Sequence, residues 1–225
     1  MLRLSTFALA AVTAAALLLA PAARAASDQQ NLVDEARITI DNLKKDQEFG
    51  NAMALMRRAR GALIVPSLLK GGFFFGGEGG SGVLLGKSGA YWSYPAFYTL
   101  ASASFGLQIG LEQAEVIMII MNEKALRAVM RNKFKVGADA GLAIVTLGSS
   151  AEAATTSAAG ADIVVWASAS GAYAGISVNG SIIAPRPSWN HAYYGRAVTV
   201  SDIITKRVVK NRGADGLRDD LASVR

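Results

Sequence analysis

The chain has 225 residues, of which 52% are hydrophobic, with a mean hydropathy of +0.30 and a formal net charge of +6. It contains no cysteine, which excludes disulfides, cysteine-ligated metal sites and a lipid anchor on an N-terminal cysteine. The modest positive charge suits attraction to anionic lipid or other polyanions. It is too weak to indicate nucleic-acid binding, because no base-stacking motif with basic flanks accompanies it.

Residues 1–25 predict a secretory signal peptide. They open with a basic stub carrying Arg3, continue with an apolar stretch from Phe7 to Ala20, and end in the small-x-small cleavage pattern Ala23-Arg24-Ala25. The apolar stretch is shorter than the roughly 20 residues that a membrane span needs, and Pro21 follows it. We therefore expect cleavage after Ala25 or one residue later, and an exported chain that is periplasmic or secreted and not a Cys-anchored lipoprotein.

Residues 26–60 predict two N-terminal helices. In the first, apolar residues recur at spacings of three to four, at Leu32, Ala36, Ile40 and Leu43. The second has Asn51 as its predicted cap, and Gly61 follows it as a natural stop. The second helix ends in basic residues, which suit the C-terminal end of a helix dipole: Arg57, Arg58 and Arg60.

Residues 61–210 predict a β-rich domain, because short apolar runs rich in aromatic and β-branched residues alternate with Gly and Pro. Asn179-Gly180 fits a tight hairpin turn. A central helix is predicted at 122–137 and a last helix at 201–210, followed by a polar tail over 211–225. This order predicts an α+β fold whose mostly antiparallel sheet curls into a barrel or sandwich, with N-terminal, central and C-terminal helices.

The glycine cluster from Gly76 to Gly82 contains a G-x-G-x-x-G pattern between two apolar runs. A dinucleotide site requires a helix directly after the last glycine, and the sequence "VLLGKSG" that follows is not helical. A P-loop also fails, because Ser81 stands where its first glycine belongs before Gly86-Lys87-Ser88. We therefore expect no nucleotide partner, and glycines that let the backbone turn or pack closely between two strands.

Several stretches of this region together resemble the SYLF domain family: "ARGALIVPSLLKGGFFFGGEGGSGVLL", "WSYPAFYTLASASFGLQIGLE", "NEKALRAVMRNKFKVGADAG" and "ADIVVWASASGAYAGISVNGSII". The resemblance covers about Ala59 to Tyr194. It implies a lipid- and membrane-binding module: eukaryotic members bind phosphoinositides and some bind actin filaments, and bacterial members are secreted, periplasmic or lipoprotein forms. This chain differs from the lipoprotein forms in lacking cysteine, and for an exported chain only the lipid part of that function transfers easily.

The residues give little support for catalysis. The chain has one histidine, His191, in an aromatic stretch, and it has no G-x-S-x-G motif. One histidine and scattered acids do not predict a metal site. We therefore expect no enzyme activity, no catalytic residues, no cofactor and no metal, with a hydrolase as a remaining alternative.

The residues favour binding of anionic lipid or phosphoinositide-like headgroups at a membrane surface. The predicted lipid-binding residues are Arg57, Arg58, Arg60, Lys70, Lys44 and Lys45. Each such cation near an anionic surface contributes very roughly 1 kcal/mol. Aromatic residues at 73–75 and 91–97 are a second candidate surface. The alternatives are an envelope structural or protein-interaction domain and a small outer-membrane barrel; internal helices count against the barrel.

Overall fold

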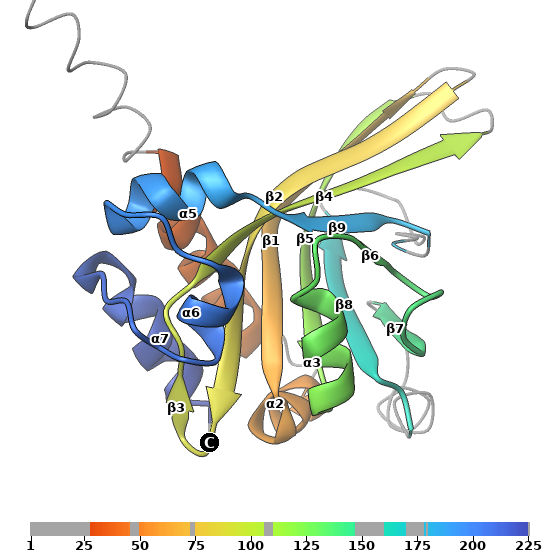
Figure 1. Ribbon diagram of the computed structural model, residues 1–225. Coiled ribbons are helices and arrows are strands. Elements are labelled where there is room, and N and C mark those ends of the chain that lie inside the picture. Colours follow the sequence, from red (N-terminus) through yellow and green to blue (C-terminus); the bar gives the residue numbers. More distant parts are fainter. Residues whose placement is uncertain are drawn as a thin grey trace, which may run out of the picture.

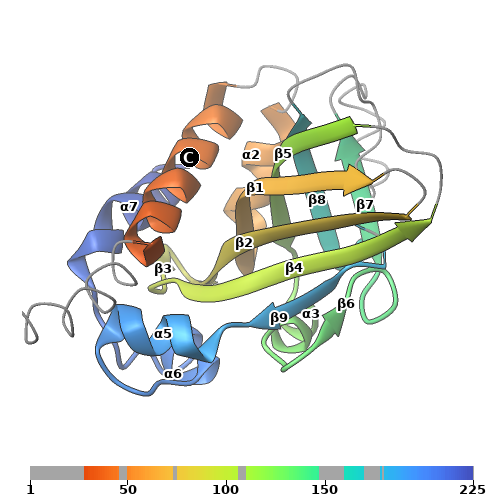
Figure 2. The same cartoon turned by 90° about the horizontal axis from the view of Figure 1, so that it is seen from above.

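The computed structural model describes residues 28–45, 50–72, 75–105, 110–146, 160–169, 178 and 180–224. Its centre is one curled sheet of nine strands with helices against both faces (Figures 1 and 2). The predicted signal peptide over 1–25 lies outside the described residues and stays a prediction. None of the described helices is long and apolar enough to cross a membrane.

The strands follow the order β6-β9-β4-β2-β1-β5-β8-β7, with the short β3 paired to β2. All pairs are antiparallel except β7 with β8. Along this path the described strands do not close into a barrel, and the sheet stays open. Their bounds are β1 Gly61–Gly72, β2 Phe75–Ser88, β3 Tyr91–Trp92, β4 Ala96–Phe105, β5 Gly110–Ile120, β6 Phe134–Lys135, β7 Leu142–Thr146, β8 Ile163–Ala169 and β9 Ile182–Pro185.

Two hydrophobic cores lie on opposite faces of the sheet, because successive residues of each strand point to opposite sides. In β5, Ile117 and Ile119 face one core while Val116 and Met118 face the other. The first core is covered by the helix at residues 28–45, α2 (Gly50–Arg58), α5 (Pro187–Tyr194) and α7 (Asp215–Ala222). The second is covered by α3 (Glu123–Val129) and α6 (Val200–Ile204).

The predicted α+β fold is confirmed, with N-terminal, central and C-terminal helices and a mostly antiparallel, curled sheet. The apolar stripe predicted for the first helix is buried throughout. Asn122 caps α3 as predicted, by accepting a hydrogen bond from the Ala125 amide. α3 is shorter than predicted: Phe134 leaves the helical pattern to pair with Ile183 at the edge of the sheet.

The glycine cluster is an extended strand, whereas the sequence favoured a turn between two strands. β2 runs through it without a break, and none of its described glycines has a positive φ. Among the glycines from Gly77 to Gly82, two are closely packed. A Cβ on Gly80 would lie 2.6 Å from the Ser67 carbonyl oxygen, and one on Gly82 would lie 2.7 Å from that of Ile64. Both glycines face the bulge that β1 forms between Ile64 and Ser67, where Pro66 lacks an amide hydrogen.

The C-terminal region departs most from the prediction. The last predicted helix, 201–210, is shortened to α6, because Thr199 and Asp202 form a capping box at its start and Arg207 takes φ 56 after its end. The sequence predicted a polar tail over 211–225, but residues 211–224 are folded. They hold a 3₁₀ turn (Arg212–Ala214) and α7, whose Leu217 and Leu221 are only 1% exposed.

α5 was also missed, because its sequence "PSWNHAYY" reads as an aromatic turn. Pro187 stands in its first turn and Gly195, at φ 68, terminates it. The hairpin predicted at Asn179-Gly180 is only partly described. Gly180 has φ +84 and lies in a turn closed by the Ser181 amide on the Val178 carbonyl, and the strand that follows, β9, pairs with β4 and β6.

Candidate functional site

A pocket of about 760 Å³ opens at the end of the sheet where β1 begins and β2 and β5 finish. The end of α2 and the turn after β2 form its walls, at the lower edge of the molecule in Figure 1. Its lining is strongly basic with an apolar part and two glycines: Leu55, Arg57, Arg58, Ala59, Arg60, Lys87, Gly89, Met121, Gly160 and Ala161. We call this the cationic pocket.

The pocket is held together by hydrogen bonds between α2 and the strand ends. The Lys87 ammonium donates to the carbonyl oxygens of Arg57 at 2.6 Å and Met56 at 3.3 Å, so it binds carbonyls at the C-terminal end of α2. The Arg60 amide donates to the Ile120 carbonyl at 2.7 Å, and the Lys87 amide donates to that of Arg60 at 2.8 Å. The basic end of α2 is therefore fixed against three neighbouring strands.

The electrostatic potential of the cationic pocket is positive, because four of its lining side chains are cations and none of its described lining residues is a carboxylate. Burial lowers the pKa of Lys87, and the nearby charges of Arg57 and Arg60 lower it further. Among the described residues, no carboxylate pairs with Arg58 or Arg60. An anion entering the pocket would relieve this repulsion between like charges.

The structure brings together three of the six predicted lipid-binding residues, Arg57, Arg58 and Arg60, all exposed. Lys44 is elsewhere: its ammonium lies 3.5 Å from Asp41 and 3.6 Å from Asp220, so its charge is balanced within the fold. Lys45 is exposed at the end of the first helix and does not line the pocket.

Lys70 lies nine residues along β1 from Gly61, which is about 30 Å at the usual rise of a strand. The structure describes the backbone of Lys70 but not its side chain. The sequence grouped Lys70 with the arginines as a predicted lipid-binding cation. Because β1 continues through Pro66 as far as Gly72, Lys70 is separated from the arginines along the strand.

Lys87 is the one cation of the pocket that the sequence did not predict. It was considered only as the lysine of a failed P-loop. Its position in β2 gave a usable signal, because it follows an apolar run that must be a buried strand and therefore emerges at the strand's end. What the sequence does not show is that this end lies beside α2.

The aromatic surface predicted at 91–97 is mostly core. Trp92 is 2% exposed and Phe97 is fully buried, packed edge-on against Trp189 and Tyr193. Tyr94 is half-buried and donates to the Asp215 carboxylate at 2.8 Å. The three phenylalanines at 73–75 have side chains outside the described residues. Tyr91 alone of the described residues in 91–97 is strongly exposed.

The described residues contain no group of three or more His, Asp or Glu side chains that could hold a metal. His191 is exposed on α5.

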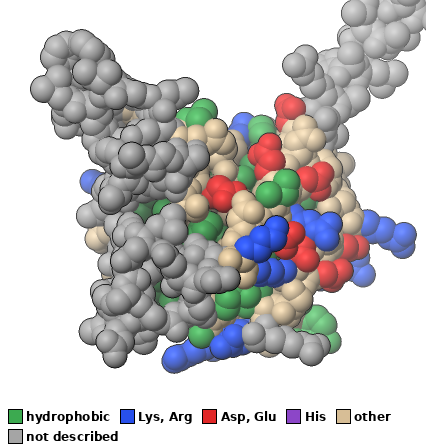
Figure 3. Space-filling view, turned by 180° about the vertical axis from the view of Figure 1, so that it is seen from behind, with side chains coloured by type: hydrophobic (Ala, Val, Ile, Leu, Met, Phe, Trp, Pro, Cys, Tyr) green, Lys and Arg blue, Asp and Glu red, His purple; other side chains and the backbone are tan. Residues whose placement is uncertain are grey.

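Opposite charges alternate over the face of the molecule seen from behind, while Lys and Arg gather at its lower edge, where α2 lies (Figure 3). The cationic pocket at this edge is suited to binding an anion.

Residues 101–224 match the family Ysc84, described as a Las17-binding protein actin regulator. The chain belongs to this family, the SYLF domain family. Relatives with similar sequences include Protein YSC84 of Saccharomyces cerevisiae, 32% identical over 190 residues, and LAS seventeen-binding protein 3 of the same yeast, 31% identical over 181 residues. These matches cover 81% and 77% of this chain but only 40% and 39% of the yeast proteins.

The SH3 domain-containing YSC84-like protein 1 of Xenopus laevis is 31% identical over 144 residues, which cover 63% of this chain and 43% of that protein. The chain thus spans about two fifths of the length of these relatives. The resemblance drawn from the glycine-rich and aromatic stretches is confirmed. The family is one of binding domains, which agrees with a function in binding.

Proposed function

We propose that this SYLF domain binds anionic lipid headgroups at a membrane surface through the cationic pocket, without catalysis. The observation that carries the proposal is the gathering of Arg57, Arg58, Arg60 and Lys87 around one opening with no carboxylate among its described lining residues. Guanidinium groups match phosphate oxygens in geometry and in charge. The apolar side chains of Leu55 and Met121 in the same pocket suit the glycerol and upper acyl region of a lipid.

The domain reaches such a surface, we further propose, after export and removal of residues 1–25. Within the proposal Lys44 and Lys70 have no role: the first is ion-paired with acids of the fold, and the second is remote from the pocket along β1. Lys45 contributes only as a long-range charge. The set of binding cations is therefore smaller than the sequence suggested and gains Lys87.

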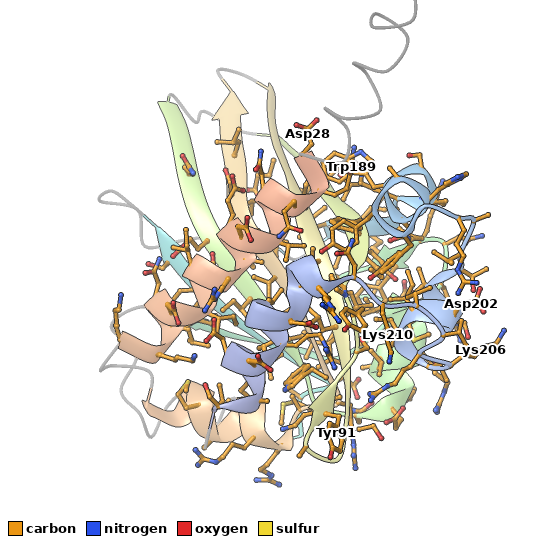
Figure 4. All side chains as sticks on the ribbon, turned by 90° about the vertical axis from the view of Figure 1, so that its left-hand side faces the viewer. Asp28, Tyr91, Trp189, Asp202, Lys206 and Lys210 are labelled. Atoms are coloured by element: carbon orange, nitrogen blue, oxygen red, sulfur yellow. The ribbon has the colours of Figure 1, made fainter. Side chains whose placement is uncertain are left out.

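Vesicle flotation tests the proposal with a triple variant, Arg57→Ala, Arg58→Ala and Arg60→Ala. At very roughly 1 kcal/mol per cation, the three arginines together contribute about 2 to 3 kcal/mol, so binding to vesicles of phosphatidylcholine and phosphatidylglycerol should fall by about 30- to 160-fold at low salt. The matched control removes three exposed cations that do not line the pocket: Lys206→Ala, Lys210→Ala and Arg212→Ala. Figure 4 shows Lys206 and Lys210 on another side of the molecule from α2.

The control variant loses the same net charge, so a purely global attraction would weaken both variants equally. A much larger loss in the pocket variant supports the proposal. Equal losses in the two variants, or binding of wild type to neutral and anionic vesicles alike, would contradict it. Circular dichroism of each variant verifies that the fold is intact.

A protein partner is the second candidate, because one yeast relative is named LAS seventeen-binding protein 3 and the matching family is described as Las17-binding. For this chain, the cationic pocket would then receive an acidic protein segment in place of a lipid. A polyglutamate peptide that displaces the domain from vesicles at low concentration, in a folded sample, favours this alternative.

A further inference from the structure

The turn between β2 and β3 reaches solvent at the rim of the cationic pocket. Ser88, Gly89, Ala90 and Tyr91 are all exposed, and Gly89 itself lines the pocket. These four residues carry no charge. The turn can therefore approach a lipid surface without stripping water from an ionised group.

Tyr91 is the most exposed large hydrophobic residue described, at 73%. A single exposed aromatic side chain is ordinary on a protein surface and does not by itself indicate a function. The position of Tyr91 in the fold is what indicates one. It lies at the same end of the molecule as α2 (Figure 4), one residue before the buried Trp92 and two after a residue of the pocket wall. Tyrosine is enriched at membrane interfaces because its ring is apolar and its hydroxyl is polar.

Hydrogen bonds to Ser93 and Arg207 fix the backbone on both sides of the turn that carries Tyr91. The Gly86 amide donates to the Ser93 hydroxyl at 2.9 Å, and the Ser93 amide donates back to the Gly86 carbonyl at 2.8 Å. The Arg207 guanidinium donates to the carbonyl oxygens of Gly86 at 3.3 Å and Tyr91 at 3.4 Å. Since the backbone is already fixed, insertion needs to order only the Tyr91 side chain, which limits the loss of conformational entropy.

We infer that Tyr91 is an interfacial anchor that inserts among lipid headgroups and holds the mouth of the cationic pocket against the membrane. The inference rests on the proposed function and adds to it a docking surface and an orientation. The partner is an anionic bilayer surface: four cations meet the headgroup charge while the uncharged turn beside them enters the interfacial layer. In this pose the end of the sheet bearing Gly61 and Gly86 faces the membrane.

The absence of cysteine from the sequence allows a direct test with a single introduced thiol. The variant Tyr91→Cys carries an environment-sensitive NBD fluorophore, and Ile182→Cys, which replaces another exposed apolar residue, is the control. The probe is vesicles of phosphatidylcholine with phosphatidylglycerol. We expect blue-shifted, brighter emission at position 91 that lipid-borne spin labels quench, and no change at position 182.

A second measurement uses unlabelled protein. Tyr91→Ser should weaken partitioning about three- to tenfold, because the variant loses part of the burial of one aromatic ring. The ratio between wild type and Tyr91→Ser should stay constant as salt rises, since apolar burial is not screened, whereas the loss caused by the triple arginine variant should shrink. Because the ring is exposed, this change should leave the melting temperature unaltered.

The outcomes separate the two ideas. Flotation on anionic vesicles with position 91 remaining in water, or with Tyr91→Ser binding as tightly as wild type, overturns the anchor and leaves the proposed function standing. Failure of the wild type to float on anionic vesicles overturns the proposed function, and the anchor with it.

Discussion

Two neighbouring glycines of β2 should respond oppositely to the same substitution. A Cβ on Gly80 would lie 2.6 Å from the Ser67 carbonyl oxygen, 2.8 Å from the Val65 Cγ1 and 3.3 Å from the Leu68 Cα. On Gly79 the nearest atom, the Leu100 carbonyl oxygen, would be 4.0 Å away. Both glycines are extended, so backbone strain does not separate them.

Gly80→Ala must move β1 away from β2 at the bulge, and overpacking of this kind costs about 1 to 3 kcal/mol. Gly79→Ala meets no obstacle, and it stabilises by about 0.4 to 1 kcal/mol because the unfolded chain loses freedom. For a domain of this size each kcal/mol moves the melting temperature by about 2 to 4 °C. We expect Gly80→Ala to lower the melting temperature by several degrees and Gly79→Ala to raise it slightly.

Thermal and urea denaturation, followed by circular dichroism on the two variants side by side, measure the difference. The sequence predicted that the glycines of this cluster allow a turn or close packing; the space around Gly79 and its extended backbone show neither at this position. Equal stability of Gly80→Ala and wild type, or a loss at 79 as large as at 80, would show that close packing against the β1 bulge is not why glycine stands there.

Four further predictions concern other parts of the chain. Glu115 accepts hydrogen bonds from Thr39 at 2.8 Å and Asn42 at 3.0 Å, so Glu115→Ala should lower the free energy of unfolding in urea by about 1 to 3 kcal/mol, and Glu115→Gln by less. Hydrogen bonds from Asn122 and the Gly141 amide lower the pKa of Asp162 in the folded protein. The stability that the ionised Asp162 supplies is therefore present above the pKa of the unfolded state and is lost as pH falls through the pKa of the folded state. Asp162→Asn should accordingly make the melting temperature depend less on pH in the acid range. Since the pKa of Lys87 is lowered, Lys87 should lose its charge, and vesicle binding should weaken, at a lower pH than for an ordinary lysine. In a plot of vesicle binding against pH, Lys87→Arg should remove this decrease. Mass spectrometry of the native protein should find an N-terminus at Ala26 or within a residue of it, and a chain that still begins at Met1 would contradict export with cleavage.

The predictable parts of this fold are those in which each residue's environment follows from its neighbours in sequence. The stripe from Leu32 to Leu43 has helical spacing and is buried, and Asn122 precedes a helix that it caps. The strands around Ile117 and Val165 are continuous apolar runs because both faces of the sheet are covered. Local pattern and tertiary environment agree at these places.

The unpredicted parts depend on distant partners. A glycine cluster reads as a turn, and only the bulge of β1 shows why Gly80 and Gly82 lie in a strand. α7 has two buried leucines four residues apart in a polar segment, and it is stable because it packs beside the first helix, where Arg37 pairs with Asp220. In the cationic pocket, the sequence predicted Arg57, Arg58 and Arg60 but not Lys87. Lys87 lies beside the arginines only because the fold places the end of β2 next to the end of α2.

The number of cations at the end of α2 exceeds what the fold needs. The C-terminal carbonyls of the helix are bound by one ammonium, that of Lys87, which donates to two of them. Arg58 and Arg60 stand exposed beside it and, within the described residues, have no carboxylate to pair with, so their mutual repulsion and the effect of Arg60 on Lys87 are costs to the folded state. A cluster that opposes stability persists where it has a function. Replacing Arg58 alone should therefore leave the melting temperature unchanged or raise it while weakening vesicle binding, and this opposition of stability and binding separates a binding site from an ordinary charged surface.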